Sequence, residues 1–319
     1  MEREAAFERG DWALLVFVAA TWGSSFLFID IGVDHFAPAL VALVRLGFGA
    51  ATLAAVPAAR RSVPRSSWPA IALLGVVWMA APFVLFGVAQ QSIDSSLAGM
   101  LNAAAPLFTA VVAALVAGRL PGRRRSAGLL IGFIGVLAIS WPSLGGAHAT
   151  AAGAGLVIAA TMLYGVAFNI AGPLQQQHGA LPVIWRAELL AAGLVAPFGI
   201  ATLSDSTFAW SSLAAVAALG CLGTALAFVA FATLAGRVGS TRASVTVYFL
   251  PAVAIALGAL FRDETIAAVS LVGTVLVTAG AYLTSRSERG AGWRRPRVAM
   301  RPTGSAPLRT AAAGDRTTT

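Results

Sequence analysis

Charge is the scarcest property of this sequence. Only 11% of its 319 residues are charged, 58% are hydrophobic, and no lysine is present. A soluble domain carries about 25% charged residues, because its surface must face water. So few charged residues cannot cover a soluble domain of this length. The composition therefore predicts an all-α integral membrane protein, whose lipid-facing surface needs no charge.

Metal ligands and catalytic motifs are also lacking. Cys221 is the single cysteine, which excludes an intramolecular disulfide and a thiolate metal site. His35, His148 and His178 lie far apart in expected loops, so we predict no metal and no cofactor. HExxH, GxSxG, DxxD and Walker motifs are missing. We therefore expect no enzyme and no ATP-driven pump. A membrane-embedded lipid-modifying enzyme and a channel are kept as alternative functions.

Apolar runs long enough to cross about 30 Å of hydrocarbon recur ten times. The first run is not a signal peptide, because the residues before it are net acidic, and we expect it to remain. A tight turn is predicted at residues 92–94, since the apolar run around it is too long for one crossing. The predicted spans are 12–32, 38–57, 69–91, 95–117, 127–143, 151–171, 181–203, 211–235, 241–260 and 265–284.

The placement of arginine gives the orientation. With a cytoplasmic N-terminus and alternating spans, 19 of the 22 arginines fall in cytoplasmic segments. Arg45 and Arg186 fall within spans, and Arg262 alone falls outside. This positive-inside pattern predicts a multi-pass protein of the plasma or inner membrane with both termini in the cytoplasm. The net charge of +9 is thereby explained by the bilayer, and no nucleic-acid partner is expected.

Four regions are predicted along the chain. Residues 1–10 form a cytoplasmic N-terminus, 11–143 a first repeat, and 151–284 a second repeat. Residues 285–319 are rich in Arg, Gly, Pro, Ser and Thr and have no apolar period, so we expect a disordered cytoplasmic tail. The tail either solubilises the cytoplasmic side or contacts anionic lipid headgroups.

The two halves resemble each other. TWGSSF around Trp22 aligns with LYGVAF around Tyr164, which also pairs Phe26 with Phe168. PLFTAVVAALVAGR aligns in the same way with PAVAIALGALFRDE. Each half holds five spans, and because five is odd, the second half enters the membrane in the opposite orientation. The prediction is ten transmembrane helices in two inverted five-helix repeats. Such repeats are typical of secondary transporters, whose site lies between the repeats.

These motifs resemble the drug/metabolite transporter superfamily, in its EamA-type branch of ten-helix, two-repeat carriers. The resemblance covers residues 11–284 through TWGSSF, Arg45, LNAAAPLFTA and FLPAVAIALGALFRDE. It implies secondary active export or exchange of a small metabolite, amino acid or drug-like solute by alternating access. One position departs from the repeat, because Glu264 corresponds to Arg119 in the first half. This mismatch suggests a loop or capping role for Glu264.

Mid-span aromatic and polar side chains are the candidates for substrate binding. Arg45 lies roughly 10 Å below the outer surface, where it binds an anionic group, pairs with Asp30, or reaches the interface alone. The aromatic candidates have packing as their alternative role, and Trp78 and Gln90 are weaker candidates. The predicted substrate-binding residues are Trp22, Ser25, Arg45, Asn102, Tyr164 and Asn169.

Glu188 is the most deeply placed carboxyl in the predicted spans. It is the candidate for proton coupling, and its alternative is a protonated, hydrogen-bonded structural role. Arg186 is close enough to the cytoplasmic end of its span to reach the interface. Glycines punctuate the fifth and tenth spans. The resemblance implies that these two helices form a scaffold that offers a homodimer contact outside the transport path.

Overall fold

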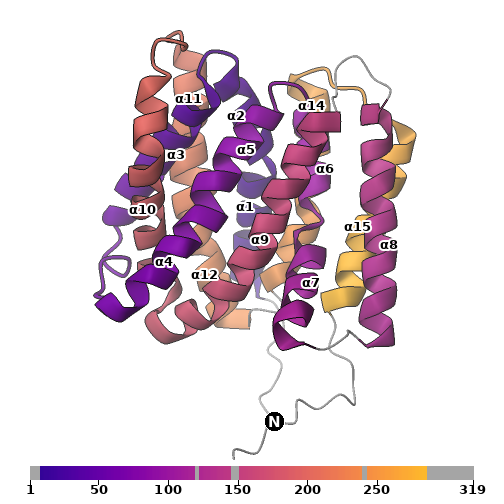
Figure 1. Cartoon of the computed structure of the whole chain (residues 1–319), viewed down its shortest axis with the longest axis horizontal. Coiled ribbons are helices and arrows are strands. Elements are labelled where there is room, and N and C mark those ends of the chain that lie inside the picture. The colour runs from indigo at the N-terminus through magenta and orange to yellow at the C-terminus, as the bar shows by residue number, and fades with distance from the viewer. Residues whose placement is uncertain (1–7, 119–121, 145–150, 239–242, 286–319) are drawn as a thin grey trace, which may run out of the picture. The chain divides into compact units, whose positions relative to one another are not determined.

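The computed structural model describes residues 8–118, 122–144, 151–238 and 243–285, which all belong to one compact unit. Within these ranges every regular element is a helix (Figure 1). The all-α class predicted from composition is therefore confirmed. The predicted tail lies outside the described residues, except for Ser285 at the end of the last helix.

The described residues of the first half form five helical segments. The first segment joins α1 and α2, the third joins η1, α4, η2 and α5, and the fourth joins α6 and α7. The bounds are α1 (Arg9–Gly23), α2 (Ser25–Val33), α3 (Pro38–Ala54), η1 (Arg65–Ser67), α4 (Trp68–Gly75), η2 (Val76–Ala80), α5 (Ala81–Ala89), α6 (Ser95–Asn102), α7 (Ala105–Ala117) and α8 (Arg123–Ser140), with a short 3-10 helix η3 (Trp141–Leu144) after it.

The described residues of the second half repeat this order. Its third segment joins α11, η4 and α12, and its fourth joins η5 and α14. The bounds are α9 (Ala151–His178), α10 (Ala180–Ala201), α11 (Trp210–Ala218), η4 (Leu219–Leu226), α12 (Ala227–Val238), η5 (Ser244–Phe249), α14 (Leu250–Phe261) and α15 (Ala268–Ser285).

Most of these segments are apolar enough to lie in a membrane. The turn predicted at residues 92–94 is present, because α5 ends before it and α6 begins at Ser95. The helix α8 begins with three arginines, which suits a start at a membrane surface. By length and composition, six described segments could cross a membrane, and three apolar helices are shorter. The six are Arg9–Val33, Arg65–Ala89, Ser95–Ala117, Ala151–His178, Ala180–Ala201 and Trp210–Val238, and the three are Pro38–Ala54, Thr246–Phe261 and Ala268–Thr284.

Both halves interrupt their helices at equivalent places. The third segment of each half contains a π-helix, η2 in the first half and η4 in the second. The fourth segment of each half is interrupted just before a proline: a turn separates α6 from α7 before Pro106, and the 3-10 helix η5 passes into α14 before Pro251. Proline has no N–H group and disrupts the helix before it. Because π-helical turns are frequent at functional sites, the matched interruptions point to the region between the halves.

A glycine in the first helix of each half permits a close contact with the other half. A Cβ atom at Gly23 would lie 2.5 Å from the Cβ atom of Val253 in α14. A Cβ atom at Gly165 would lie 2.8 Å from the carbonyl carbon of Phe108 in α7. The first helix of each half therefore packs on the fourth segment of the opposite half. This crossed packing forms part of the boundary between the repeats.

The last helices of the two halves, α8 and α15, pack against each other through small residues. A Cβ atom at Gly135 would lie 2.6 Å from the carbonyl oxygen of Gly273. One at Gly280 would lie 2.5 Å from the carbonyl oxygen of Gly128. Such contacts are typical of paired transmembrane helices. These glycines therefore join the two helices within one chain, and a homodimer contact through these two helices stays a prediction.

Candidate functional site

Aromatic rings from both halves form one continuous row. The centroids of neighbouring rings lie 5.1–6.0 Å apart, which is the range of favourable ring contacts. Trp22 and Tyr164, the two predicted aromatic residues, both belong to the row and are linked through other rings. In order, the row consists of Phe231, Trp22, Phe228, Trp78, Phe168, Tyr164, Phe86 and Phe26.

The ring contacts cross between the halves in a symmetric way. Trp22 of α1 contacts Phe228 and Phe231 of α12, with centroid distances of 5.7 and 5.1 Å. Tyr164 of α9 contacts Phe86 of α5 at 5.8 Å. Each first-helix aromatic therefore lies against the third segment of the opposite half. This is the arrangement that a pseudo-twofold axis between inverted repeats produces.

Trp78, a weaker candidate from the sequence, lies in the middle of the row. It belongs to the π-helix η2 and contacts Phe168 at 5.7 Å and Phe228 at 5.2 Å. Phe168 keeps 40% of its surface exposed, so other side chains do not cover the row at this ring. An aromatic wall of this kind suits the apolar part of a small organic solute.

Arg45 of α3 is buried close to this row. Its Nε atom donates a hydrogen bond to Oγ1 of Thr224 in η4, at 3.0 Å. Its guanidinium carbon lies 3.6 Å from the centroid of the Phe83 ring, a cation–π contact. Tyr164 of the row is within electrostatic range of this guanidinium. The site therefore combines aromatic rings with one buried cation.

Glu188 of α10 is completely buried, and neither of its carboxylate oxygens has a hydrogen-bond partner. Its Oε1 atom lies so close to Gly49 of α3 that any side chain there would overlap it. The carbonyl oxygen of Gly220 in η4 borders the same position. Arg45 is within electrostatic range, although the two residues form no ion pair. The deep carboxyl predicted from the sequence therefore lies where α3, α10 and η4 meet.

The other predicted binding residues differ in how their polar atoms are used. Ser25 donates its hydroxyl to the carbonyl oxygen of Thr21 at 3.0 Å. Asn169 donates its amide to two main-chain carbonyls, one of them that of Thr109 in α7 at 3.0 Å. Asn102 is buried at the end of α6, and its Oδ1 atom has no hydrogen-bond partner. Asn169 therefore fastens α9 to α7, and Asn102 keeps an unused acceptor.

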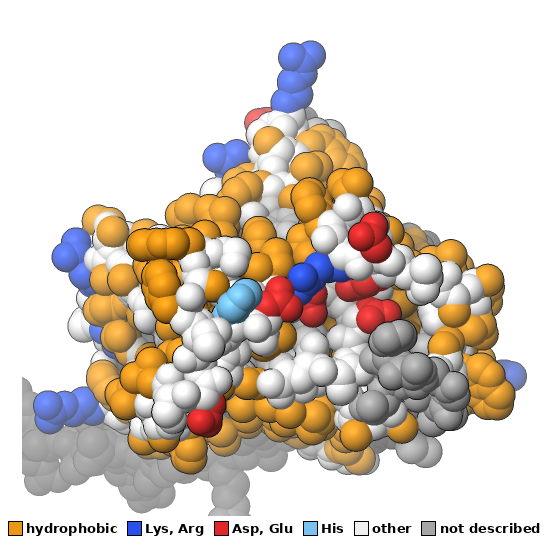
Figure 2. All heavy atoms as spheres, turned by 90° about the horizontal axis from the view of Figure 1, so that it is seen from above, with side chains coloured by type: hydrophobic (Ala, Val, Ile, Leu, Met, Phe, Trp, Pro, Cys, Tyr) orange, Lys and Arg blue, Asp and Glu red, His pale blue; other side chains and the backbone are white. Residues whose placement is uncertain are grey.

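Arg262, the residue after α14, joins the two halves at one end of the helices. Its Nε atom pairs with Oδ2 of Asp30, and its Nη2 atom lies 2.8 Å from Oδ2 of Asp34. We call these three residues the Arg262 network. Figure 2 shows a basic side chain between acidic ones on this face. Burial alone would lower the pKa of Arg262, but the hydrogen bonds and charges of the two aspartates outweigh burial and raise it.

A pair of Asp30 with Arg45, one of the alternatives left open by the sequence, is therefore not formed. Asp30 lies near the end of α2, beside the chain that leaves α14. Arg45 lies roughly two turns into α3, where Thr224 and Phe83 surround its side chain. The depth of Asp30 along its helix did not show whether its partner would be Arg45 or Arg262.

Glu264 attaches the same loop to α6. Its Oε1 atom accepts hydrogen bonds from the main-chain nitrogen and the hydroxyl of Ser95, at 2.9 and 2.7 Å. Its Oε2 atom accepts one from the nitrogen of Ser96, at 2.9 Å. A carboxylate at a helix N-terminus satisfies free N–H groups and complements the helix dipole. The capping role predicted for Glu264 is confirmed.

Another ion pair joins the halves at the opposite end of the helices. Arg237 at the end of α12 lies 3.5 Å, from Nη1 to Oδ1, from Asp11 at the start of α1. At this end Arg186 points back along α10, because its Nη1 atom donates to the carbonyl oxygen of Pro182 at 3.0 Å. This direction is compatible with the prediction that Arg186 reaches the interface, which stays a prediction.

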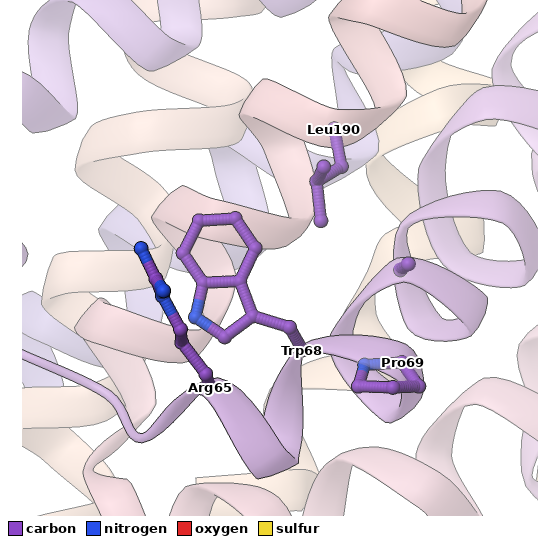
Figure 3. A pocket seen from close by; sticks show the side chains of 5 residues that line it. Arg65, Trp68, Pro69 and Leu190 are labelled. Atoms are coloured by element: carbon purple, nitrogen blue, oxygen red, sulfur yellow. The ribbon is translucent and has the colours of Figure 1, made fainter.

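A surface hollow between α4 and α10 is separate from the ring row. It has a volume of about 590 Å³, and none of the predicted site residues line it. Its arginine and tryptophan near the start of α4 suit a membrane interface. The lining residues are Arg65, Trp68, Pro69, Ala72 and Leu190 (Figure 3).

The repeats and their helices match a known family. The profile of the EamA-like transporter family matches residues 11–141 and again residues 151–286. The chain belongs to the EamA-like transporter family. One match in each half confirms the fold of ten transmembrane helices in two inverted five-helix repeats. The family also places the chain among membrane transporters of small metabolites, and not among enzymes.

Some curated relatives of this EamA-family transporter are named as exporters or efflux pumps, and others only as transporters. A probable terminal-alkyne amino-acid exporter of Streptantibioticus cattleyicolor is 30% identical over 285 residues, which cover 88% of this chain and 94% of the relative. A probable amino-acid metabolite efflux pump of Salmonella typhimurium is 28% identical, with 86% and 94% covered. A protein of known crystal structure is 16% identical, with a TM-score of 0.59 and 86% and 96% covered. That likeness concerns the fold alone.

Several site residues were missed by the sequence reasoning. Phe168 could have been found, because the repeat alignment pairs it with Phe26 and both lie in the row. Phe83, Thr224 and Phe228 had no such signal. Their parts in the site depend on which helix faces meet, and an apolar run does not reveal those faces.

Proposed function

We propose that this transporter exports an amino acid or an amino-acid-derived metabolite across the plasma or inner membrane. The row of rings that crosses between the halves, with the buried Arg45 beside it, is the observation that carries this proposal. The rings suit an apolar side chain, and an arginine suits a carboxylate. The names of two exporters of amino acids or their metabolites among the relatives support the same substrate class.

Transport proceeds by alternating access, as a secondary process. The Arg262 network ties α2 to α14 at one end, and the pair of Asp11 with Arg237 ties α1 to α12 at the other. Both ties join opposite halves, so opening either end of the site requires one tie to break. Inverted repeats that rock against each other around a central site provide this motion.

Glu188 takes part in proton coupling. An unpaired carboxylate is costly to bury, so a completely buried carboxyl without hydrogen bonds favours binding of a proton. Arg45 on α3 is an ionisable group within its electrostatic neighbourhood. Movement of α3 against α10 would expose the carboxyl and allow the proton to leave.

Both termini lie in the cytoplasm in this proposal. The support is the positive-inside pattern and the position of Arg262, whose charge two aspartates balance. Single cysteines at Ser204 and Arg124, introduced after Cys221→Ala, test the orientation in intact cells. An impermeant thiol reagent should label the first and not the second. The reverse labelling pattern would show that the protein is inverted.

Substrate export is tested by tolerance and by flux. Expression of the chain in a bacterial host should raise the concentration of toxic amino-acid analogues that the cells survive. The protein in proteoliposomes should then exchange the same compounds. Trp22→Ala and Tyr164→Ala should weaken the apparent affinity while thermal stability is kept. Trp210→Ala is the matched control, because this exposed tryptophan lies outside the row. Normal flux in both row variants would remove the row from the transport path.

A further inference from the structure

The guanidinium of Arg45 has unused hydrogen-bond donors. Only its Nε–H group is bonded, to Thr224, and the side chain stacks on Phe83. The four N–H groups on Nη1 and Nη2 have no hydrogen-bond partner among the described residues. Arg45 is nevertheless only 8% exposed. Nη1 and Nη2 are not among the fully buried atoms without a partner, so these two nitrogens remain open to an acceptor that a bound solute would supply.

The shape of the free donors selects the acceptor. Nη1 and Nη2 of an arginine form a planar fork that fits the two oxygens of a carboxylate with parallel hydrogen bonds. Thr224 and Phe83 already hold one edge and one face of the group, so the fork is fixed before a solute arrives. Its position near Tyr164 places the carboxylate at the edge of the aromatic row.

The structure offers no comparable partner for an ammonium group. In this conformation Glu188 is completely buried against Gly49, so its oxygens are not open to a solute. Asp30 is bound to Arg262, and Asp11 is bound to Arg237. Among the described residues, these three are the acidic side chains located within the helices of the two repeats. A positively charged α-amino group would therefore meet rings and neutral polar atoms.

Arg45 offers free donors to a carboxylate, whereas no acidic side chain within the described helices is available to an ammonium group. We therefore infer that the transporter recognises its solute by a carboxylate and an apolar side chain, and does not recognise the α-amino group. Its substrate class is then that of apolar or aromatic monocarboxylates. Amino acids belong to the class, and so do their N-acylated forms. The inference rests on the proposed function, because it assigns the solute of the same site.

The test measures binding of four related probes to the full-length protein in detergent by thermal shift and tryptophan fluorescence. The probes are L-phenylalanine, N-acetyl-L-phenylalanine, L-phenylalaninamide and phenethylamine. The two carboxylates should bind with similar affinity. The two amines should bind at least about tenfold more weakly, because they cannot engage the fork.

Two variants identify the group responsible. Arg45→Gln should remove the preference for carboxylates. Arg186→Gln is the matched control, because it removes another arginine from within a helix while leaving Arg45 untouched, and it should keep the preference. The inference is overturned if phenethylamine binds as well as phenylalanine, or if N-acetylation abolishes binding. It is also overturned if none of the probes binds at millimolar concentration.

Failure of this inference is distinguishable from failure of the export proposal. A protein that binds both carboxylates but moves neither phenylalanine nor another amino acid in proteoliposomes would refute export and support the inference. A protein that exchanges phenylalanine but binds phenethylamine equally well would support export and refute the inference. A loss of phenylalanine binding in Glu188→Gln, with N-acetylphenylalanine unaffected, would show that Glu188 reads the amino group and would also refute it.

Discussion

Replacing Arg262 by glutamine should open the end of the transporter that the Arg262 network closes. The Arg262 and Asp30 side chains are only 27% and 17% exposed, and a hydrogen bond to a charged group contributes about 1.5–3 kcal/mol. Asp34 is 43% exposed, so its ion pair contributes about 0.2–1 kcal/mol. Water replaces part of both interactions when the end opens. We therefore expect a net loss of about 2 kcal/mol, which shifts the ratio of closed to open states about thirty-fold.

The assay measures how fast a buried position becomes accessible from outside. Ser25 is buried and lies five residues before Asp30, roughly 7–8 Å deeper along the first segment. Ser25→Cys in a Cys221→Ala background gives one reactive thiol beneath the network. An impermeant thiol reagent added outside should modify it faster in Arg262→Gln, by up to about thirty-fold.

A matched variant at the opposite end tests the reasoning. Arg237→Gln removes the ion pair with Asp11, and it should not speed modification from outside. Asp30→Asn should reproduce the effect of Arg262→Gln. The double variant should add little, because both changes remove the same interaction. Equal labelling in Arg262→Gln and the unmodified protein would refute the closing role of the network, and so would a similar increase in Arg237→Gln.

Three further outcomes are expected. Glu188→Gln should lose the dependence of flux on a pH gradient and keep exchange; unchanged pH dependence in proteoliposomes would assign Glu188 a structural role. Gly49→Ala should lower stability by about 1–3 kcal/mol in a thermal denaturation assay, because its methyl group would overlap the Glu188 carboxylate. Gly47→Ala, which has open space, should have little effect and serves as the control. Deleting residues 290–319 should leave flux and stability intact, and an inactive truncated protein at normal abundance would contradict that expectation.

The membrane fold could be predicted almost completely from the sequence. Spans, turns and repeats follow from hydrophobicity, which must extend over the whole length of a crossing. The mismatch of Glu264 with Arg119 in the other half suggested a loop or capping role, and the structure shows Glu264 as the cap of α6. These features are local, or repeat along the chain, and need no knowledge of which helix faces meet.

The partners of buried charges could not be predicted in this way. A pair of Asp30 with Arg45 was one of the alternatives left open by the sequence, and Asp30 instead meets Arg262. The π-helix η4 places Thr224 beside Arg45, yet its sequence lies within an uninterrupted apolar run. Contacts of this kind depend on the rotation of each helix about its own axis. Hydrophobicity on all sides of a membrane helix leaves that rotation undetermined.

The two repeats share the apolar part of the site and differ in its charged part. Arg45 lies seven residues after Pro38, and Glu188 lies six residues after Pro182, so the second helices carry opposite charges at nearly equivalent depth. The rings, in contrast, are matched across the axis, with Trp22 and Tyr164 each on the opposite half's third segment. A symmetric apolar wall accepts a side chain in either orientation. Under the proposed function, the asymmetric charges would fix which end of the solute faces Arg45 and leave Glu188 to bind the proton.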